Sequence, residues 1–358
     1  MSRRLRVGIL FGGKSAEHEV SILSARNVML ALDPARFEPV LIGIDKGGRW
    51  LLQEAELLLS AEGDPRLLRL ASGAAEATIV PVPSGDTNID VVFPVLHGPL
   101  GEDGTVQGLL ELADLPYVGA GVLGSAVGMD KDVMKRLLAQ AGVPVAAFRT
   151  LRAAEFRRDP AAACARAAEL GFPLFTKPAN LGSSVGVRRV ARAEDLPAAL
   201  AEAFTYDVKA LAEAAVTGRE IECSVLGDDD PIASVPGEIV VTHRDGFYSY
   251  EAKYVDEDGA ALEIPARLTP VEIAAVRALA IRAFQVLECS GMARVDFFLQ
   301  PDGTLLVNEI NTIPGFTAIS MYPKLWEQSG IPPRELVTRL IDLALARKQR
   351  QRALKTGF

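Results

Sequence analysis

The stretch ARVDFFLQPDGTLLVNEIN, residues 293–311, decides how the C-terminal part of this chain folds. Two apolar runs, 294–299 and 304–310, stand on either side of Asp302 and Gly303. An Asp-Gly dipeptide between two such runs is a strong signal for a tight turn between antiparallel strands. The sequence therefore predicts a β-hairpin here, with its turn at those two residues.

Pairing along this hairpin predicts where its polar side chains meet. With a two-residue turn, Pro301 faces Thr304, and counting back places Asp296 opposite Glu309. Asn311 shares the face of Glu309 because side chains alternate along a strand. Two carboxylates about 5 Å apart repel by roughly 3 kcal/mol at an effective dielectric of about 20, so we expect a cation between them. Oxygen ligands favour Mg²⁺ or Mn²⁺, and a solvated face of an edge hairpin is the alternative.

A second group of residues has the composition of a phosphate site. Lys177 ends a predicted strand, and the loop NLGSSVG, residues 180–186, follows it. Glycines free the backbone of such a loop, so its N–H groups, with Ser183 and Ser184, can surround phosphate oxygens. Lys131 stands in the first turn of a predicted helix, where the helix dipole disfavours a cation unless it meets an anion. An ordinary hairpin loop and a solvent-facing lysine are the alternatives.

Two residues near the hairpin are suited to stabilising negative charge. Gly315, in the segment NTIPG after the second strand, permits a close approach of the backbone to a ligand. Arg294 precedes Asp296 by two residues and so points to the same face. Its planar fork fits a carboxylate or a developing oxyanion. A structural salt bridge is the alternative for this arginine.

Strands and helices alternate along the N-terminal third of the chain, which indicates an α/β unit over residues 1–120. Continuous apolar runs predict buried parallel strands at 6–11, 37–44 and 90–96, and helical spacing predicts a helix at 102–112. Ser15 or Ser21 is expected to cap the helix that follows the first strand. Farther along we expect helices at 129–142, 271–287 and 334–345 and strands at 173–177, 185–190, 220–226 and 232–241.

Two short glycine motifs are interpreted as coincidental. GILFGGKS at 8–15 matches the P-loop pattern, but Gly8 lies inside a run that must be a strand, and a strand cannot also be the loop that wraps phosphates. GAGVLG at 119–124 matches the dinucleotide pattern, yet no Asp or Glu occurs from Val133 to Ala154, where an acid that holds the ribose is expected. We read the second motif as a Gly-rich turn between domains.

Composition narrows the class of protein. The chain has 358 residues, 49% hydrophobic and 23% charged, which is typical of a globular protein with two or three domains. The net charge of −8 argues against nucleic acid as a partner. Three widely spaced cysteines support neither a disulfide framework nor a zinc site and fit a reducing compartment. No apolar stretch of about 18 residues predicts a membrane span, so we expect a cytoplasmic protein with no membrane partner.

Six segments occur in order along the chain and together carry a family resemblance: GGKSAEHEVS (12–21), HGPLGEDGTVQGLLE (97–111), KPANLGSSVGV (177–187), YEAKY (250–254), ARVDFFL (293–299) and NEINTIPGFT (308–317). From about Gly12 to Met321 the chain resembles the D-alanine–D-alanine ligase family of the ATP-grasp superfamily. Residues 46–88 and the C-terminal tail fall outside the resemblance.

The resemblance implies a mixed α/β and α+β architecture, the ATP-grasp fold with an N-terminal Rossmann-like parallel-sheet domain. Its domains would be an N-terminal α/β domain (1–120), a central ATP-grasp domain (121–213) and a C-terminal ATP-grasp domain (214–358). The implied ATP phosphate ligands are Lys131, Lys177, Ser183 and Ser184, and those of the adenosine end are Glu213, Ala214, Ala215 and Glu220. Two Mg²⁺ (or Mn²⁺) ions would be bound by Asp296, Glu309 and Asn311.

Further roles are implied for residues around the substrates. Glu17 would anchor the ammonium group of a first D-alanine, and Ser183 and Tyr254, with Lys253 beside the tyrosine, would hold a loop shut near it. Arg294 and the Gly315 N–H would stabilise an oxyanion, and Ser320 would receive the second substrate's carboxylate. His97 would lie near the first substrate, with no role assigned.

The implied activity is ATP-dependent ligation of two D-alanines through an acyl phosphate, for peptidoglycan precursors, by a homodimer whose partners are D-alanine and ATP. Tyr254 favours an amine as second substrate, and D-lactate or D-serine is the alternative. Ala214 and Ala215 depart from relatives that often carry a lysine and an aromatic residue there, which puts side-chain packing on adenine in doubt. Two functions of other classes are the alternatives. A nucleotide-dependent oxidoreductase built on the motif at 119–124 is disfavoured because the acid that would hold the ribose is missing. A non-catalytic binding protein is disfavoured because binding alone does not require a pair of metal ions.

Overall fold

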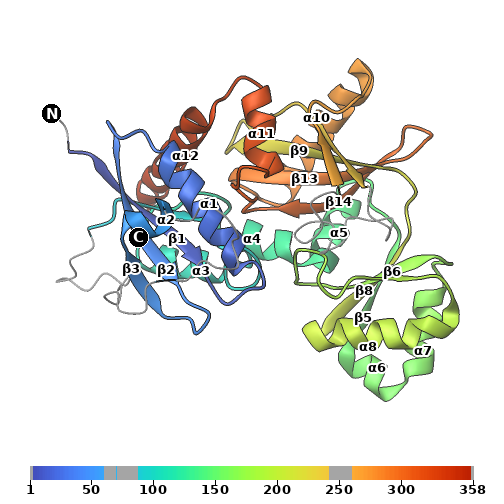
Figure 1. The fold of residues 1–358 in the computed structure, drawn as a ribbon. Coiled ribbons are helices and arrows are strands. Elements are labelled where there is room, and N and C mark those ends of the chain that lie inside the picture. The colour runs from blue at the N-terminus through green and yellow to red at the C-terminus, as the bar shows by residue number, and fades with distance from the viewer. Residues whose placement is uncertain (1–2, 60–69, 71–87, 242–259, 356–358) are drawn as a thin grey trace.

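The computed structural model describes residues 3–59, 70, 88–241 and 260–355, and within these residues the strands form three sheets (Figure 1). The N-terminal sheet lies on the left of Figure 1, the C-terminal sheet at the upper right and a smaller central sheet at the lower right. Helices α4 (Val122–Met129) and α5 (Lys131–Gln140) lie between them. In the described part of the chain, no helix combines the length and hydrophobicity that crossing a membrane requires.

The N-terminal sheet has the strand order β3-β2-β1-β4. β1 pairs in parallel with β2 and β4, whereas β3 pairs antiparallel with β2 at the edge. Helix α1 packs on β1 and helix α12 contacts β4, so these strands are covered and their unbroken apolar runs are explained. The expected parallel-sheet unit is confirmed. Its elements are β1 (Leu5–Gly12), α1 (His18–Ala31), β2 (Phe37–Ile44), β3 (Trp50–Gln53), α2 (Ala55–Leu59), β4 (Val91–Pro94) and α3 (Thr105–Leu112).

The junction between β1 and α1 requires glycine. Gly12 has a φ of 88°, and a Cβ there would lie 2.3 Å from the Ile44 carbonyl oxygen. The expectation that a serine caps α1 is wrong, because the N-cap is Glu17 and no side chain makes the cap hydrogen bond. Ser15 instead accepts the Glu17 N–H at 2.9 Å, and Ser21 lies inside the helix, where it bonds to the ends of β1 and β4.

The central sheet has the strand order β5-β8-β6-β7 and is antiparallel. The predicted strand at 185–190 begins late, because Ser183, Ser184 and Gly186 have φ values of 52°, 57° and 71°, outside the range of a strand. The elements are β5 (Phe148–Arg152), α6 (Ala153–Arg158), α7 (Pro160–Ala168), β6 (Leu174–Pro178), β7 (Arg188–Val190), η2 (Ala193–Asp195), α8 (Leu196–Tyr206) and β8 (Lys209–Ala214).

The C-terminal sheet has the strand order β12-β11-β9-β13-β14, with β10 paired to β9. The predicted single strand at 232–241 is wrong: it is divided into β10 and β11, and Pro236 between them has no N–H to donate to a ladder. The elements are β9 (Arg219–Gly227), β10 (Ile232–Ala233), β11 (Gly237–Val241), β12 (Ala260–Glu263), α10 (Pro270–Val286), β13 (Gly291–Leu299), β14 (Leu305–Asn311), α11 (Met321–Gln328) and α12 (Pro333–Arg352).

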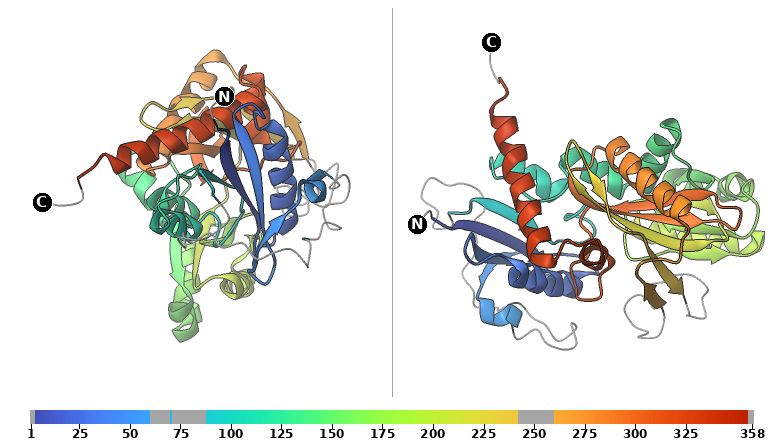
Figure 2. Two further views of the ribbon diagram at one scale, coloured as in Figure 1. Left: turned by 90° about the vertical axis from the view of Figure 1, so that its left-hand side faces the viewer. Right: turned by 90° about the horizontal axis from the view of Figure 1, so that it is seen from above.

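The largest apolar core joins the N-terminal sheet to the C-terminal helices. Buried side chains of β1, β4 and α1 share one cluster with those of α11 and α12. The ring of Phe316 meets that of Phe93 on β4 edge-to-face at 5.8 Å and that of Tyr322 on α11 at 5.5 Å. Figure 2 shows α12 running along the N-terminal unit, far in sequence from the strands it covers. This core fixes the loop after β14 against the N-terminal sheet.

Candidate active site

The predicted pairing of Asp296 with Glu309 is confirmed, since the two residues are partners in the ladder of β13 and β14. The predicted two-residue turn is wrong. The last ladder pair is Leu299 with Leu305, and the Gln300 N–H donates to the Thr304 carbonyl oxygen at 2.9 Å, which leaves a three-residue turn at 301–303 that ends on Gly303 with a φ of 86°. A left-handed last residue is the common solution for a hairpin loop of this length.

A β-bulge restores the expected partners. Phe297 pairs with Val307, whereas Asp296 pairs with Glu309, so Asn308 is the extra residue on β14. The longer turn shifts the register by one residue and the bulge shifts it back. Simple counting therefore reached the right pair although its turn was wrong.

Arg294 occupies the acidic face of this hairpin. It forms two hydrogen bonds of 2.7 Å with the Asp296 carboxylate and an ion pair of 3.0 Å with Glu222. Burial works against the charged guanidinium, but Asp296 and Glu222 outweigh it and hold the pKa of Arg294 well above its ordinary value. The salt bridge weighed as an alternative is therefore present. Asn311 Nδ2 also donates to Asp296 at 3.0 Å.

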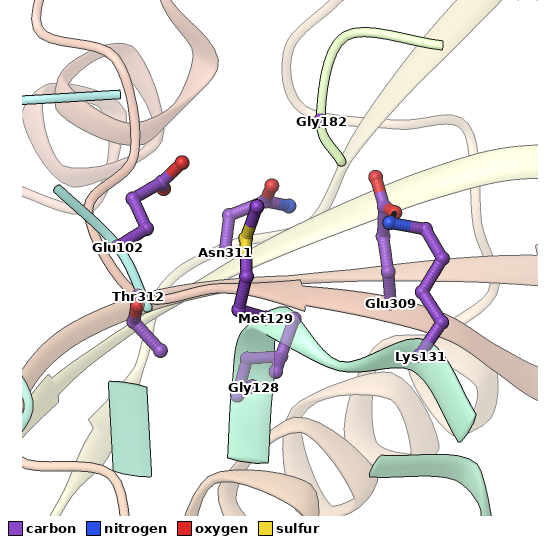
Figure 3. Close-up of a pocket in the computed structure, with 9 residues that line it drawn as sticks. Glu102, Gly128, Met129, Lys131, Gly182, Glu309, Asn311 and Thr312 are labelled. Carbon is purple, nitrogen blue, oxygen red and sulfur yellow. Dashed lines mark ion pairs between the residues drawn. The ribbon is translucent and has the colours of Figure 1, made fainter. Parts of the chain in front are cut away.

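Lys131 on α5 forms an ion pair with Glu309 on β14. Its Nζ lies 3.2 Å from Glu309 Oε2 and donates to the Leu181 carbonyl oxygen at 2.9 Å. Figure 3 shows Lys131, Glu309 and Asn311 pointing into one pocket, with Gly182 above them and Glu102 at the far end. α5, the 180–186 loop, β14 and the loop after β4 thus meet at one place.

Repulsion within the Asp296–Glu309 pair is offset by protein cations, Arg294 and Lys131. The argument that this repulsion by itself requires a divalent cation is therefore wrong. Among the described residues, no group of three or more His, Cys, Asp or Glu side chains is arranged to hold a metal ion. Asp296, Glu309 and Asn311 together provide two carboxylates and one amide, so the atoms that could ligate a metal ion are all oxygens.

A buried ionic cluster lies beside the pocket and includes a lysine that the sequence analysis missed. Lys135 Nζ and Lys177 Nζ each lie 2.6 Å from the Glu213 carboxylate. Burial opposes the charge on Glu213, but Lys135 and Lys177 outweigh it and lower its pKa to about 2. Counted as formal charges, two lysines against one carboxylate leave an excess of one positive charge, although burial and Lys177 lower the pKa of Lys135 against the effect of Glu213. The signal for Lys135 was its spacing of four residues from Lys131 on one helix.

The loop 180–186 is anchored at its start and lies close to Glu17. Asp207 accepts the Asn180 backbone N–H and its Nδ2, both at 2.9 Å. A Cβ on Gly182 would lie 3.3 Å from Glu17 Oε2. The structure therefore brings the predicted phosphate loop, including Ser183 and Ser184, to the residue predicted to anchor an ammonium group. Lys253 and Tyr254 lie outside the described residues.

Glu102 is a second residue that the sequence analysis missed. Its Oε2 accepts the Gly98 N–H at 2.6 Å. Burial, reinforced by the negative charge of Glu17, raises the pKa of Glu102 to about 8. Perturbed carboxyl groups of this kind gather at functional sites. The available signal was an acid inside a Gly-rich segment that follows a buried strand.

His97 is buried and has partners on both ring nitrogens. Nδ1 lies 3.1 Å from the Ile313 carbonyl oxygen and Nε2 lies 3.3 Å from Ser24 Oγ. Burial lowers the pKa of His97 and outweighs the nearby charge of Glu17. The imidazole is therefore neutral at physiological pH.

Gly315 and Ser320 lie together at the end of the loop after β14. Ser320 Oγ accepts the Thr317 N–H at 3.0 Å, and a Cβ on Gly315 would lie 2.7 Å from this oxygen. A side chain at position 315 would therefore displace the Ser320 hydroxyl. The predicted adenosine residues are more dispersed: Ala214 and Ala215 end β8 beside Glu213, whereas Glu220 lies on β9 of the other sheet.

The rejected glycine motifs remain rejected. Gly8 lies in the middle of β1, as the sequence predicted. In the 119–124 segment, a Cβ on Gly124 would lie 2.4 Å from the Glu288 carbonyl oxygen. This glycine allows α4 to pack against the chain before β13. The expected Gly-rich turn is limited to 119–121, because Val122 begins α4.

The antiparallel central and C-terminal sheets, a mostly parallel N-terminal sheet, and a pocket lined by Lys131, Glu102 and Glu309 define an enzyme of the ATP-grasp fold.

Comparison with known proteins agrees with this class. Residues 6–120 match the family model described as D-ala D-ala ligase N-terminus, and residues 137–342 match that of its C-terminus. The chain belongs to the D-alanine–D-alanine ligase family.

Individual relatives match over nearly the whole chain. A D-alanine–D-alanine ligase A from Chromobacterium violaceum is 53% identical over 362 residues, covering 98% of each chain, and one from Escherichia coli K12 is 50% identical, covering 99% of each. The solved D-alanine-D-alanine ligase from Coxiella burnetii has a TM-score of 0.85 and 41% identity, covering 98% of this chain and 97% of that one. The VanG D-Ala:D-Ser ligase from Enterococcus faecalis has a TM-score of 0.81 and 34% identity, covering 96% and 100%.

Proposed function

We propose that this chain joins two molecules of D-alanine into D-alanyl-D-alanine, with cleavage of ATP to ADP and phosphate, for peptidoglycan precursor synthesis. Membership of the family and about 50% identity over the whole chain to ligases of that name support this activity. The observation that carries the proposal is the pocket that Lys131, Glu309, Asn311, Gly182 and Glu102 line together.

The cationic cluster supports a phosphate site on one side of this pocket. Lys177 and Lys135 share the single carboxylate of Glu213, so an anion nearby is favoured. Lys177 and Lys131 would contact ATP phosphates, and the left-handed backbone at Ser183 and Ser184 turns successive N–H groups to one side of the loop. Together these groups neutralise charge on a phosphoryl group during transfer.

Asp296, Glu309 and Asn311 fit Mg²⁺ or Mn²⁺, and we propose that they hold two ions. Their donors are oxygen atoms, and the Asn311 amide oxygen is left to bind a cation when Nδ2 donates to Asp296. Asp296 would share its oxygens between the cations and Arg294. Bound cations would supply charge neutralisation at the phosphates.

The adenosine end of ATP is proposed to lie at Glu213, Ala214, Ala215 and Glu220. β8 ends here, and Ala215 N–H already donates to the Pro173 carbonyl oxygen at 3.2 Å. Small side chains at 214 and 215 leave contacts with the base to backbone atoms and to Glu220.

The proposed reaction has two steps. The carboxylate of the first D-alanine, held through its ammonium by Glu17 near His97, attacks the γ-phosphorus, and ADP leaves with the electron pair of the broken P–O bond. The amine of the second D-alanine, whose carboxylate Ser320 receives, attacks the acyl phosphate carbon after losing a proton. The Gly315 N–H and Arg294 stabilise the resulting oxyanion, and phosphate then leaves. Lys253 and Tyr254 would help to close the site.

Assay of the reaction tests this function. Incubation with ATP, Mg²⁺ and D-alanine is expected to release phosphate and to form the dipeptide, detected by mass spectrometry. Phosphate release with another amino acid but not with D-alanine would reassign the substrate.

The second substrate is a separate question, because a structure of 34% identity is that of a D-Ala:D-Ser ligase. We propose D-alanine as the second substrate. Competition of D-serine and D-lactate with D-alanine, with products resolved by mass, tests this choice: a dominant mixed product would overturn it.

We further propose three domains divided at 120/121 and 213/214, a homodimer and a cytoplasmic location. Each of the three sheets is drawn from one of these stretches except for Ala214, the last residue of β8, which lies just past the second division. Sedimentation equilibrium that returns the monomer mass at micromolar concentration would contradict the dimer.

A further inference from the structure

Side chains of helix α1 form hydrogen bonds with one end of the loop after β14. Ser24 Oγ accepts the Phe316 N–H at 3.1 Å, and Asn27 Nδ2 donates to the Phe316 carbonyl oxygen at 2.8 Å. Ser24 and Asn27 are neighbours on one face of the helix because they are three residues apart. Both polar backbone groups of Phe316 are therefore held by side chains nearly 300 positions earlier in the chain, at separations of 292 and 289 residues.

The segment after β4 forms a hydrogen bond with the other end of the same loop. His97 Nδ1 lies 3.1 Å from the Ile313 carbonyl oxygen. The Glu102 carboxyl group lies near the same backbone, and Ile313 opposes the rise of its pKa. Ile313 and Phe316, on either side of Pro314 and Gly315, are thus both held from the N-terminal unit.

The donor and the acceptor in each of these hydrogen bonds can be assigned. Ser24 Oγ accepts from the Phe316 N–H, so its own proton is free to be donated to His97 Nε2 at 3.3 Å. His97 then carries its proton on Nδ1 and donates it to Ile313. A neutral imidazole satisfies every bond in this chain, and its burial favours that form.

Packing removes most of the remaining freedom of the loop. Phe316 is wedged between the rings of Phe93 and Tyr322. Pro314 has a fixed φ, and a Cβ on Gly315 would lie 2.7 Å from Ser320 Oγ, so a side chain there would displace that hydroxyl. The orientation of the Gly315 N–H is therefore set by the groups that hold Ile313 and Phe316.

We propose that Ser24 and Asn27 are positioning residues that aim the Gly315 N–H at the oxyanion, with His97 acting as a connector in the same network. This inference rests on the proposed function of Gly315. Helix α1 also begins directly after Glu17, its N-cap, and Ser24 lies about two turns farther along. One helix would thus set both the ammonium anchor of the first D-alanine and the oxyanion donor.

We call the two hydrogen bonds of Ser24 and Asn27 with the Phe316 backbone the clamp. Two variants each remove one of these bonds, and a third variant serves as control. Ser24→Ala removes the acceptor of the Phe316 N–H, and Asn27→Ala, at a partly buried position, removes the donor to its carbonyl oxygen. Ser21→Ala is the matched control, since Ser21 is an equally buried hydroxyl on the same helix but bonds to Gly12 and Val95 instead. We expect kcat to fall at least about tenfold in both clamp variants, with KM for ATP and D-alanine within about threefold, because misplacement of a catalytic donor costs rate.

Positional isotope exchange separates this role from a structural one. ATP labelled with ¹⁸O in the β–γ bridge scrambles when the first step reverses, and that step does not use the Gly315 N–H. We expect the ratio of exchange to net dipeptide formation to rise at least about fivefold in Ser24→Ala and Asn27→Ala, and to stay at the wild-type value in Ser21→Ala.

Each outcome decides one part of the account. A ratio that rises in both clamp variants, or in Asn27→Ala if Ser24→Ala does not fold, supports the clamp. Equal losses of exchange and turnover, or no loss, overturn it. A wild-type protein that shows no D-alanine-dependent exchange and forms no dipeptide would overturn the proposed function itself.

Discussion

The two ionic clusters beside the pocket have opposite excess charges. On the hairpin side, Glu222, Asp296 and Glu309 provide three formal negative charges against the two positive charges of Arg294 and Lys131, an excess of one negative charge. On the central-sheet side, the Lys135–Glu213–Lys177 cluster has an excess of one positive charge. Each cluster is internally paired, yet neither is neutral.

We propose that this difference in charge determines what each side binds. A paired cluster with a residual charge keeps its side chains ordered without a ligand and still attracts one of opposite sign. The hairpin side suits divalent cations and the central-sheet side suits phosphates. A magnesium–nucleotide complex presents both charges at once, so the pocket between the clusters matches it.

The largest expected effect comes from removing charge on the hairpin side. Glu309→Gln keeps the shape of the side chain but leaves that cluster neutral and removes an anionic oxygen from the proposed cation site. We expect kcat to fall by about three orders of magnitude or more, since several kcal/mol of charge stabilisation are lost. Steady-state phosphate release measures the rate, and circular dichroism is expected to show an unchanged fold.

Glu238→Gln is the matched control for this variant. Glu238 is a buried carboxylate on β11 of the same sheet that pairs with Arg219. A small loss of activity is expected there. Full activity in Glu309→Gln would refute the cation assignment.

A smaller effect is expected from the central-sheet side. Lys135→Met removes the excess positive charge but leaves Glu213 paired with Lys177. We expect KM for ATP to rise about tenfold, equal to about 1.4 kcal/mol, together with a lower melting temperature because a buried ion pair is broken.

Lys348→Met separates the two consequences. Lys348 is also buried and pairs with Glu111 and Asp114 away from the pocket. That variant should lower the melting temperature without changing KM for ATP. An unchanged KM in Lys135→Met would show that the charge excess does not act on the nucleotide.

The smallest expected effect concerns Glu102, a partly buried carboxyl group that lies near Glu17 rather than between two lysines. Its pKa is about 8 in the fold against an ordinary value of 4.5. The folded state therefore binds a proton more tightly, so the stability contributed by Glu102 is complete below pH 4.5 and is lost as the pH rises toward about 8.

Glu102→Gln removes this titration. Relative to wild type, its free energy of unfolding should improve as pH rises through that interval, by up to roughly 1.4 kcal/mol per pH unit. Urea denaturation at several pH values measures the difference. A difference independent of pH would mean that Glu102 is ionised in the fold throughout.

The sequence predicted the parts of the molecule that depend on local pattern. Apolar runs predicted the parallel N-terminal strands, and counting back from the turn placed Asp296 opposite Glu309. Local pattern did not predict the length of the hairpin turn or the bulge, because the two shifts cancel in a simple count. It also joined β10 and β11, where Pro236 interrupts the ladder.

The parts that were missed depend on contacts between distant segments. Lys135 and Glu213 come from α5 and β8, and no periodicity relates them. Ser24 and Phe316 meet only because α1 and the loop after β14 pack on one core. The role of His97 followed from the same packing. Such contacts are properties of the assembled fold.

A crystal structure with ADP, Mg²⁺ and a phosphorylated transition-state mimic tests the opposite charge excesses most directly. We expect the cations on oxygen atoms of Glu309, Asn311 and Asp296, and the phosphates within hydrogen-bond distance of Lys131 and Lys177. Phosphates bound away from both lysines, with no cation at Glu309, would contradict this account.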